Sequence, residues 1–190
     1  MNETRDLGVI LDSKLSFKNH VNHTINESRR MLGFLIRNSV NFVNSETIQT
    51  LYYSLVRSHL EYASVVWNPR TAEATKSIEK VQKRFLRYLY HKQFGYHSYD
   101  IKYEELLRGY EMKSLIGRRD IFSLIFLHDL IHYKKRDSAL LKAINIYIPY
   151  FNSRSTNIFA ESHYRTHIFS NAPINRALKL YNDLSKIHNN

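Results

Sequence analysis

The sequence contains no cysteine, which excludes disulfide bonds and thiolate metal sites and fits a reducing compartment. It has no run of about 18 apolar residues, the length that a membrane-spanning helix needs. Its first residues, MNETRD, do not have the pattern of a signal peptide. We therefore expect a soluble intracellular protein, and nothing in the sequence decides between nucleus and cytoplasm.

Motifs of catalysis are also missing. The sequence has no Gly-rich phosphate loop and no Gly-x-Ser-x-Gly motif, so nucleotide hydrolysis and serine hydrolysis lack support. Nucleotidyl transfer by two metal ions requires paired carboxylates at one spot. The adjacent acids Glu104 and Glu105 lie in an expected helix, where neighbouring side chains point about 100° apart and face solvent. We expect no catalytic residues and no cofactor.

Two histidines have the spacing of a zinc site. His128 and His132, in the segment HDLIH, are four residues apart on an expected helix and could bind one ion. Asp129 is one methylene shorter than the Glu that metalloproteases use as a general base, and the sequence marks no third ligand. We interpret the pair as surface histidines, with a zinc hydrolase as a remote alternative.

The composition indicates one main folded body with a basic surface. Of 190 residues, 43% are hydrophobic and 13% aromatic, more than a disordered chain carries. Lys and Arg number 28 against 17 Asp and Glu, which gives a formal charge of +11 and favours polyanionic partners such as nucleic acid. Residues 1–92 carry 14 basic and 8 acidic residues, so the first half has the larger excess.

Hydrophobic periodicity predicts a mainly α fold that begins with three helices, over residues 16–37, 45–66 and 71–91. Ser16 is the expected N-cap of the first helix. The apolar stripe of the second includes His59, which we expect to be buried and hydrogen-bonded. Trp67 and Phe85 should be at least partly buried. A short strand, Leu7 to Leu11, precedes these helices, and its pairing partner is not evident.

The third helix has a basic face opposite its apolar face. Four cations fall within about 60° of one another when placed on a helical wheel: Lys76, Lys80, Lys83 and Arg87. Such a stripe could follow a phosphate backbone, although a solvated helix face is the more common role of Lys and Arg.

The second half is expected to contain further helices and a loop-rich segment. A short helix should end near Gly109, and residues 114–133 should form a central helix that is apolar on most sides. Residues 144–150 should be extended, and residues 170–184 should form a helix with Pro173 near its start. The expected division is a strand and link over 1–15, a three-helix unit over 16–92 and a connector over 93–190.

Several segments resemble a known family. The residues that carry the resemblance are DLGVILDSKLSFKNHV (6–21), RRMLGFLIRNS (29–39), LYYSLVRSHLEYASVVWNP (51–69), IEKVQKRFLRYLY (78–90), LIGRRDIFSLIFLHDLIHYKK (115–135), ALLKAINIYIP (139–149) and YRTHIFSNAPINRALKLYNDL (164–184). In this order and spacing they resemble the region of a non-LTR, jockey-like retrotransposon reverse transcriptase that follows the catalytic palm.

The resemblance implies an RNA-directed DNA polymerase thumb with a C-terminal connector. The strand Leu7 to Leu11 would close a palm sheet, and the three helices would hold a template–primer duplex. The catalytic aspartates of the family would lie before residue 1, so a truncated, non-catalytic element is expected. The implied phosphate-facing residues are Lys76, Lys80, Lys83 and Arg87 on the third helix, with Arg30 and Arg37 on the first.

A different class of function stays open beside duplex binding. If the strand Leu7 to Leu11 has an unpaired edge, it can recruit another protein or a second copy of this chain. The alternative is therefore a structural or protein-interaction module derived from a degenerate mobile element. Neither hypothesis involves a membrane.

Overall fold

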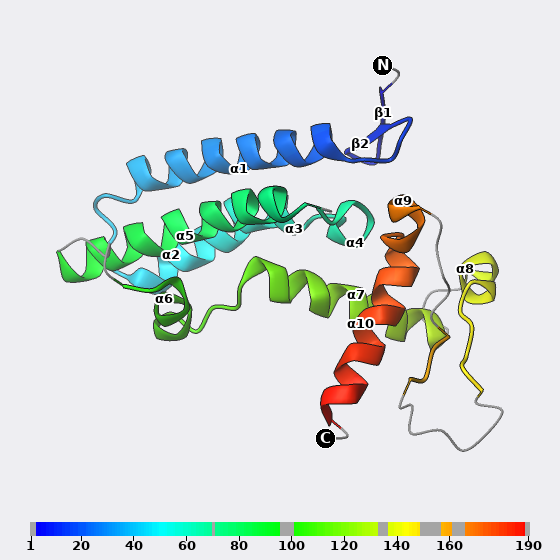
Figure 1. Ribbon diagram of the computed structural model, residues 1–190. Helices are drawn as coiled ribbons and strands as arrows, with labels where there is room; N and C mark the ends of the chain where they lie inside the picture. Colours follow the sequence, from blue (N-terminus) through cyan, green and yellow to red (C-terminus); the bar gives the residue numbers. More distant parts are fainter. Residues whose placement is uncertain are drawn as a thin grey trace. The chain divides into compact units, whose positions relative to one another are not determined.

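The computed structural model describes residues 3–69, 71–95, 101–132, 137–148, 157–160 and 166–188. The described chain is mainly helical, with two short antiparallel strands, which confirms the expected fold class (Figure 1). It divides into two compact units, residues 1–118 and 119–190, so the boundary lies within helix α7, Leu115–Ile131. No helix in the described residues is long and apolar enough to cross a membrane.

The strand at the start of the chain pairs with the residues just before it. Strand β1, Glu3–Asp6, and strand β2, Val9–Asp12, form an antiparallel hairpin in which Asp6 lies opposite Val9. Leu7 and Gly8 form the two-residue turn with φ of 44° and 86°, as expected of a tight hairpin turn with both central residues in the left-handed region. Leu7 is therefore in the turn, and the expected lone strand has its partner within this chain.

Helix α1, Lys18–Asn38, begins without a side-chain cap from its own N-cap residue. The N-cap is Phe17, in the left-handed region, and not Ser16 as expected. Asp12 orders the turn before the helix, because its carboxylate accepts hydrogen bonds from the backbone N–H groups of Lys14, Ser16 and Phe17 at 2.9, 3.0 and 2.9 Å. The Ser16 hydroxyl accepts the first helical N–H, that of Lys18, at 3.4 Å. The bonds to its carboxylate lower the pKa of Asp12 below its ordinary value.

The expected second helix is interrupted twice. Helix α2, Ser45–Tyr52, continues as a π-helical turn η1, Tyr53–Arg57, and a short helix α3, Ser58–Glu61. The chain then breaks at Ala63, whose φ is 51°, before the short helix α4, Ser64–Trp67. The break lets the buried Trp67 ring donate its indole N–H to the Tyr62 carbonyl at 2.6 Å.

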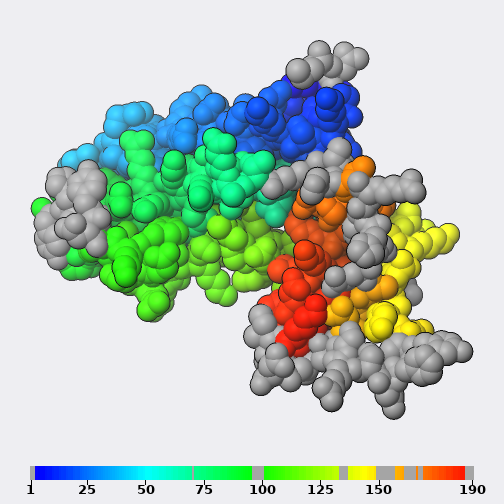
Figure 2. Space-filling model, viewed as in Figure 1, coloured from blue at the N-terminus to red at the C-terminus, as the bar shows by residue number. Residues whose placement is uncertain are grey.

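Helix α5, Ala72–Phe94, is the longest element of unit 1 and matches the expected third helix. It begins at the N-cap Thr71, whose hydroxyl accepts from the Ala74 N–H, and ends at Gly95 with φ of 76°. Helices α1 and α2 pack against α5, and α1 also packs against η1 and α3. These contacts make α1 to α5 a helical bundle, and Figure 2 shows the blue surface of α1 lying against the green surface of the later helices.

A fully buried amide lies at the centre of this bundle. Gln82 of α5 accepts a hydrogen bond from the Tyr52 hydroxyl at 3.2 Å, and its own amide donates to the Tyr103 hydroxyl and the Lys113 carbonyl at 3.1 and 3.0 Å. Tyr52 also stacks on Phe85, with ring centroids 3.9 Å apart. Trp67 and Phe85 are both fully buried, as predicted.

Residues beyond 92 belong to the first unit. Helix α6, Tyr103–Gly109, packs on α5, and Leu106, Met112 and Leu115 join the core of unit 1. Tyr103 donates its hydroxyl to the Glu79 carboxylate, which also accepts the Leu115 N–H at 3.0 Å. Unit 1 thus extends to residue 118, past the expected division at 92.

Unit 2 has its own small core. Its described elements after α7 are α8, Ser138–Lys142, α9, His167–Ser170, and α10, Pro173–His188, which begins at the expected proline. The expected extended segment contributes a single bridge between Ile146 and Phe159, and residues 149–150 lie outside the described residues. The buried Asn182 amide holds the Phe159 backbone N–H and carbonyl at 3.1 and 2.9 Å.

The buried amide yields a stability prediction. Replacing Gln82 with Ala leaves a cavity and removes the partner of the fully buried Tyr52 hydroxyl and of the Lys113 carbonyl, so Gln82→Ala should lower the free energy of unfolding by about 3 kcal/mol. Urea denaturation measures this change. Lys80→Gln, at an exposed position of the same helix, is the matched control and should change stability by less than about 0.5 kcal/mol. Equal effects of the two substitutions would contradict the role of Gln82.

Candidate nucleic-acid interface

The predicted basic stripe lies on α5, but its four members differ in accessibility. Lys76 and Lys80 are exposed, whereas Lys83 and Arg87 are half-buried. The Lys83 ammonium lies 6.0 Å from the centre of the Tyr103 ring, so α6 covers this edge of the stripe. Lys76 and Lys80 are therefore the members best placed to meet a ligand.

The structure adds a cation that the sequence interpretation missed. Arg84 is exposed on α5, one helical turn beyond Lys80, which is itself one turn beyond Lys76. Among the described residues these three side chains make no ion pair. We call Lys76, Lys80 and Arg84 the α5 cation row. The i, i+4 spacing was the available signal for Arg84.

The two predicted arginines of α1 lie on the side of that helix opposite its buried residues. Arg30 and Arg37 are both exposed. The Arg30 guanidinium is paired with Glu27, which neutralises part of its charge. Because α1 and α5 pack through their buried faces, each set of cations lies on the outer side of its own helix. The structure does not bring the arginines of α1 into one cluster with the α5 cation row.

The acidic pair and the histidine pair considered in the sequence analysis are all exposed: Glu104, Glu105, His128 and His132. Glu104 and Glu105 are exposed in the first turn of α6, as expected. The ring of His128, on α7, lies 4.2 Å from the ring of His132, which follows the end of that helix, and the His128 Nδ1 is 3.5 Å from Asp129. In the part of the chain that the structure describes, no group of three His, Cys, Asp or Glu side chains is placed to hold a metal ion.

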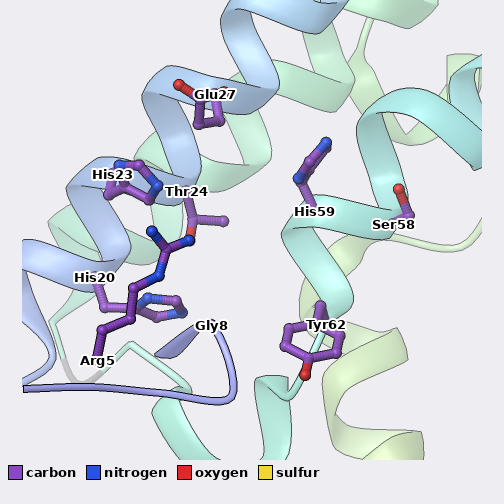
Figure 3. Close-up of a pocket in the computed structure, with 9 residues that line it drawn as sticks. All are labelled: Arg5, Gly8, His20, His23, Thr24, Glu27, Ser58, His59 and Tyr62. Atoms are coloured by element: carbon purple, nitrogen blue, oxygen red, sulfur yellow. The ribbon is translucent and has the colours of Figure 1, made fainter. Parts of the chain in front are cut away.

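A polar pocket lies beside α1, between the hairpin turn, α1 and α3. Its volume is about 320 Å³. Figure 3 shows one wall formed by Arg5 and α1 residues, with His59 and Tyr62 on the opposite side. The complete lining consists of Arg5, Gly8, His20, His23, Thr24, Glu27, Ser58, His59 and Tyr62.

His20 is held between the hairpin and the core. Its Nδ1 accepts the Ile10 backbone N–H at 3.3 Å, which assigns the proton of the neutral ring to Nε2. Its ring meets the Trp67 ring edge-to-face, with centroids 5.1 Å apart. Burial lowers the pKa of His20 below its ordinary value, and the charges of His23 and Arg5 lower it further.

This hydrogen bond also changes the expectation for the strand edge. One side of β2 pairs with β1, and on its other side the Ile10 N–H is bound by His20. In addition, Tyr62 donates its hydroxyl to the Leu7 carbonyl at 2.8 Å, which fastens the turn to the end of α3. The edge that we expected to be unpaired from Leu7 to Leu11 is thus occupied by this chain at the Ile10 N–H and at the Leu7 carbonyl.

His59 corrects a second prediction. The helical pattern places it in the buried stripe of residues 45–66, but the structure leaves it exposed at the pocket. The π-helical turn at Tyr53–Arg57 inserts an extra residue before His59 and rotates the following residues relative to a regular helix. Val66, on α4 beyond the break at Ala63, is exposed as well.

Comparison with known proteins identifies a relative of unknown activity. The chain is 26% identical over 143 residues to an uncharacterized protein of Caenorhabditis elegans, an alignment that covers 74% of this chain and 70% of the relative. No protein-family model matches the sequence. No solved structure matches the chain either.

The buried imidazole gives a pH prediction. The folded state, with its lowered His20 pKa, binds fewer protons than the unfolded state near pH 6, so stability should fall as the pH falls through about 6.5. Urea denaturation at pH 7.5 and 5.5 measures the loss. His20→Gln should reduce the loss, and His91→Gln, at an exposed position of α5, should leave it unchanged. The same loss in all three proteins would refute the assignment.

Proposed function

We propose that this protein binds nucleic-acid duplexes, without sequence preference, through the α5 cation row. The observation that supports the proposal best is the row itself, in which Lys76, Lys80 and Arg84 are exposed and make no ion pair among the described residues. Phosphates supply most of the affinity in non-specific nucleic-acid binding, and such contacts require accessible cations rather than base-reading groups.

The spacing of the row suits a phosphate backbone. From residue 76 to residue 84 an α-helix rises about 12 Å, and phosphates of one duplex strand recur about every 3.4 Å along the axis. Each cation can therefore meet a different phosphate. Like charges at i, i+4 destabilise an isolated helix by a few tenths of a kcal/mol per pair, and phosphate binding would relieve that repulsion.

The packing of α5 supports a rigid contact surface. The opposite face of the helix is locked into the core by Ile78, Phe85 and Leu89, which are almost completely buried. Gln82 fixes the helix to α2 and α6 through the tyrosine hydroxyls. The resemblance to a retrotransposon reverse transcriptase thumb implies the same kind of partner, a template–primer duplex, and we propose that this chain is a non-catalytic relative of that region.

Charge reversal tests the row directly. Lys76→Glu, Lys80→Glu and Arg84→Glu together should weaken duplex binding, and the slope of log affinity against log salt should lose roughly two to three units, at about 0.9 per phosphate on B-DNA. Fluorescence anisotropy with DNA, RNA and hybrid duplexes over a salt series measures both quantities. Lys83 and Arg87 are left unchanged because they are half-buried and their reversal could unfold the helix.

The control carries the same change in net charge on a different surface. Lys102→Glu, Arg108→Glu and Lys113→Glu replace exposed residues in and beside α6. This variant should keep most of the salt slope, and both variants should melt like the parent. A folded row variant with parental affinity and slope would refute the proposed interface and favour the protein-interaction alternative.

Polymerase activity is a separate test. Because the resemblance assigns the catalytic aspartates of the family to a region outside these residues, we propose that this chain binds duplexes without extending primers. A primer-extension assay with magnesium or manganese should show no nucleotide incorporation. Incorporation that is lost when one acidic residue of the chain is replaced would reveal a catalytic site and contradict the proposal.

A further inference from the structure

The polar pocket beside α1 has the composition of an anion site. Its lining includes one arginine and three histidines, contributed by β1, α1 and α3. Thr24 adds a hydroxyl group, whereas the hydroxyls of Ser58 and Tyr62 already donate to the Ser54 and Leu7 carbonyls. A small cavity with several converging N–H and O–H groups is the usual form of a site for a phosphate or another oxyanion.

The basic side chains at this pocket have N–H donors without a partner among the described residues. Among the described residues, the side chains of Arg5, His23 and His59 make no hydrogen bond or ion pair. Arg5 is permanently charged, and its planar guanidinium can grip two oxygens of a phosphate at once. Figure 3 shows Arg5 extending along the α1 wall toward His23 and Thr24, with His59 across the cavity.

One carboxylate lines the same pocket and does not cancel this charge. Glu27 is paired with the Arg30 guanidinium at the rim, so part of its negative charge is already compensated. Arg5 and His23 lie close enough to His20 for their charges to disfavour its protonation. The local field is therefore positive.

The size of the pocket limits the ligand. A volume of about 320 Å³ is near the lower end for small-molecule sites, which range from about 300 to 1,000 Å³. A single nucleotide fits this scale, whereas a duplex can only present its end. The pocket also lies outside the α5 cation row, since none of its lining residues comes from α5.

We infer that this pocket binds a terminal phosphate, carried either by a free nucleotide or by the end of a nucleic-acid strand. The phosphate lies between Arg5 and His59, with His23 and Thr24 as further donors. Tyr62, which bonds to the Leu7 carbonyl, holds the hairpin turn so that Arg5 of β1 stays over the pocket. This inference does not depend on duplex binding by α5.

The test compares ligands that differ only in the phosphate. Isothermal titration of the full chain with adenosine monophosphate should show saturable binding, and adenosine should show none. An oligonucleotide with a 5′-phosphate should bind more tightly than the same strand with a 5′-hydroxyl if strand ends are the source. If only the free nucleotide shows the difference, the source is the nucleotide. Equal binding of adenosine and its monophosphate would overturn the inference.

Substitutions locate the phosphate within the fold. Arg5→Gln and His59→Gln should each weaken binding of adenosine monophosphate about tenfold, the effect of losing one charge-assisted hydrogen bond. Lys14→Gln, an exposed position outside the pocket, should have no effect. All three sites are exposed, and the melting temperature of each variant should match the parent. Parental affinity in a folded Arg5→Gln variant would refute the site.

Two further measurements distinguish phosphate binding in this pocket from duplex binding on α5 and from metal binding. The charge-reversed α5 variant should keep its affinity for adenosine monophosphate even if it loses duplex binding, so the two proposals can fail independently. Titration with zinc alone tests whether histidines of the pocket bind a metal ion instead. Zinc binding that His59→Gln abolishes, together with no binding of the nucleotide, would replace the phosphate by a metal ion.

Discussion

The arrangement of unit 1 depends on the hydrogen bonds that one buried amide requires. Gln82 has no access to solvent, so each of its polar atoms must find a partner inside the protein or incur a large desolvation cost. The partners come from three other segments: the Tyr52 hydroxyl of α2, the Tyr103 hydroxyl of α6 and the Lys113 carbonyl before α7. Burial raises the pKa values of both tyrosines, which keeps their hydroxyls protonated. These directional bonds fix the rotation of α5, which apolar packing alone leaves less defined.

That rotation decides which residues are available for binding. With Gln82 turned inward, Lys76, Lys80 and Arg84 face outward, and Lys83 turns toward Tyr103 at the edge of α6. The interior hydrogen bonds and the exposed cations are thus two consequences of one helix orientation. On the other side of the bundle, the irregular path from Tyr53 to Trp67 has a comparable effect. It exposes His59 and directs Tyr62 to the hairpin, which together form one side of the polar pocket.

Much of this fold follows from regular patterns in the sequence. The periodicity of residues 71–91, with Thr71 at its start and Gly95 after its end, is a local signal, and the helix formed where this signal predicts it. The hairpin was not predicted because a turn of Leu7 and Gly8 lacks the usual Asn-Gly or Asp-Gly signature.

The break at Ala63 has no glycine or proline to mark it. Its left-handed backbone goes with the burial of Trp67 and with the Tyr62 bond to the distant Leu7 carbonyl, and a contact between distant segments has no local signal. The sequence does not predict the pocket for the same reason, because Arg5, His23 and His59 come together only in the folded chain.

The hydrogen bond between Tyr62 and the Leu7 carbonyl has a thermodynamic consequence. It joins the terminal hairpin to the end of α3, and the residues on both sides of that bond line the pocket. A two-stranded hairpin on its own is marginal in water, so the hairpin relies on this attachment and on the His20 bond to Ile10. Any molecule that occupies the pocket binds only when the hairpin is docked, and by mass action it therefore shifts the local opening equilibrium toward the closed form. Amide hydrogen exchange in residues 3–12 would report occupancy of the pocket without any label on the ligand.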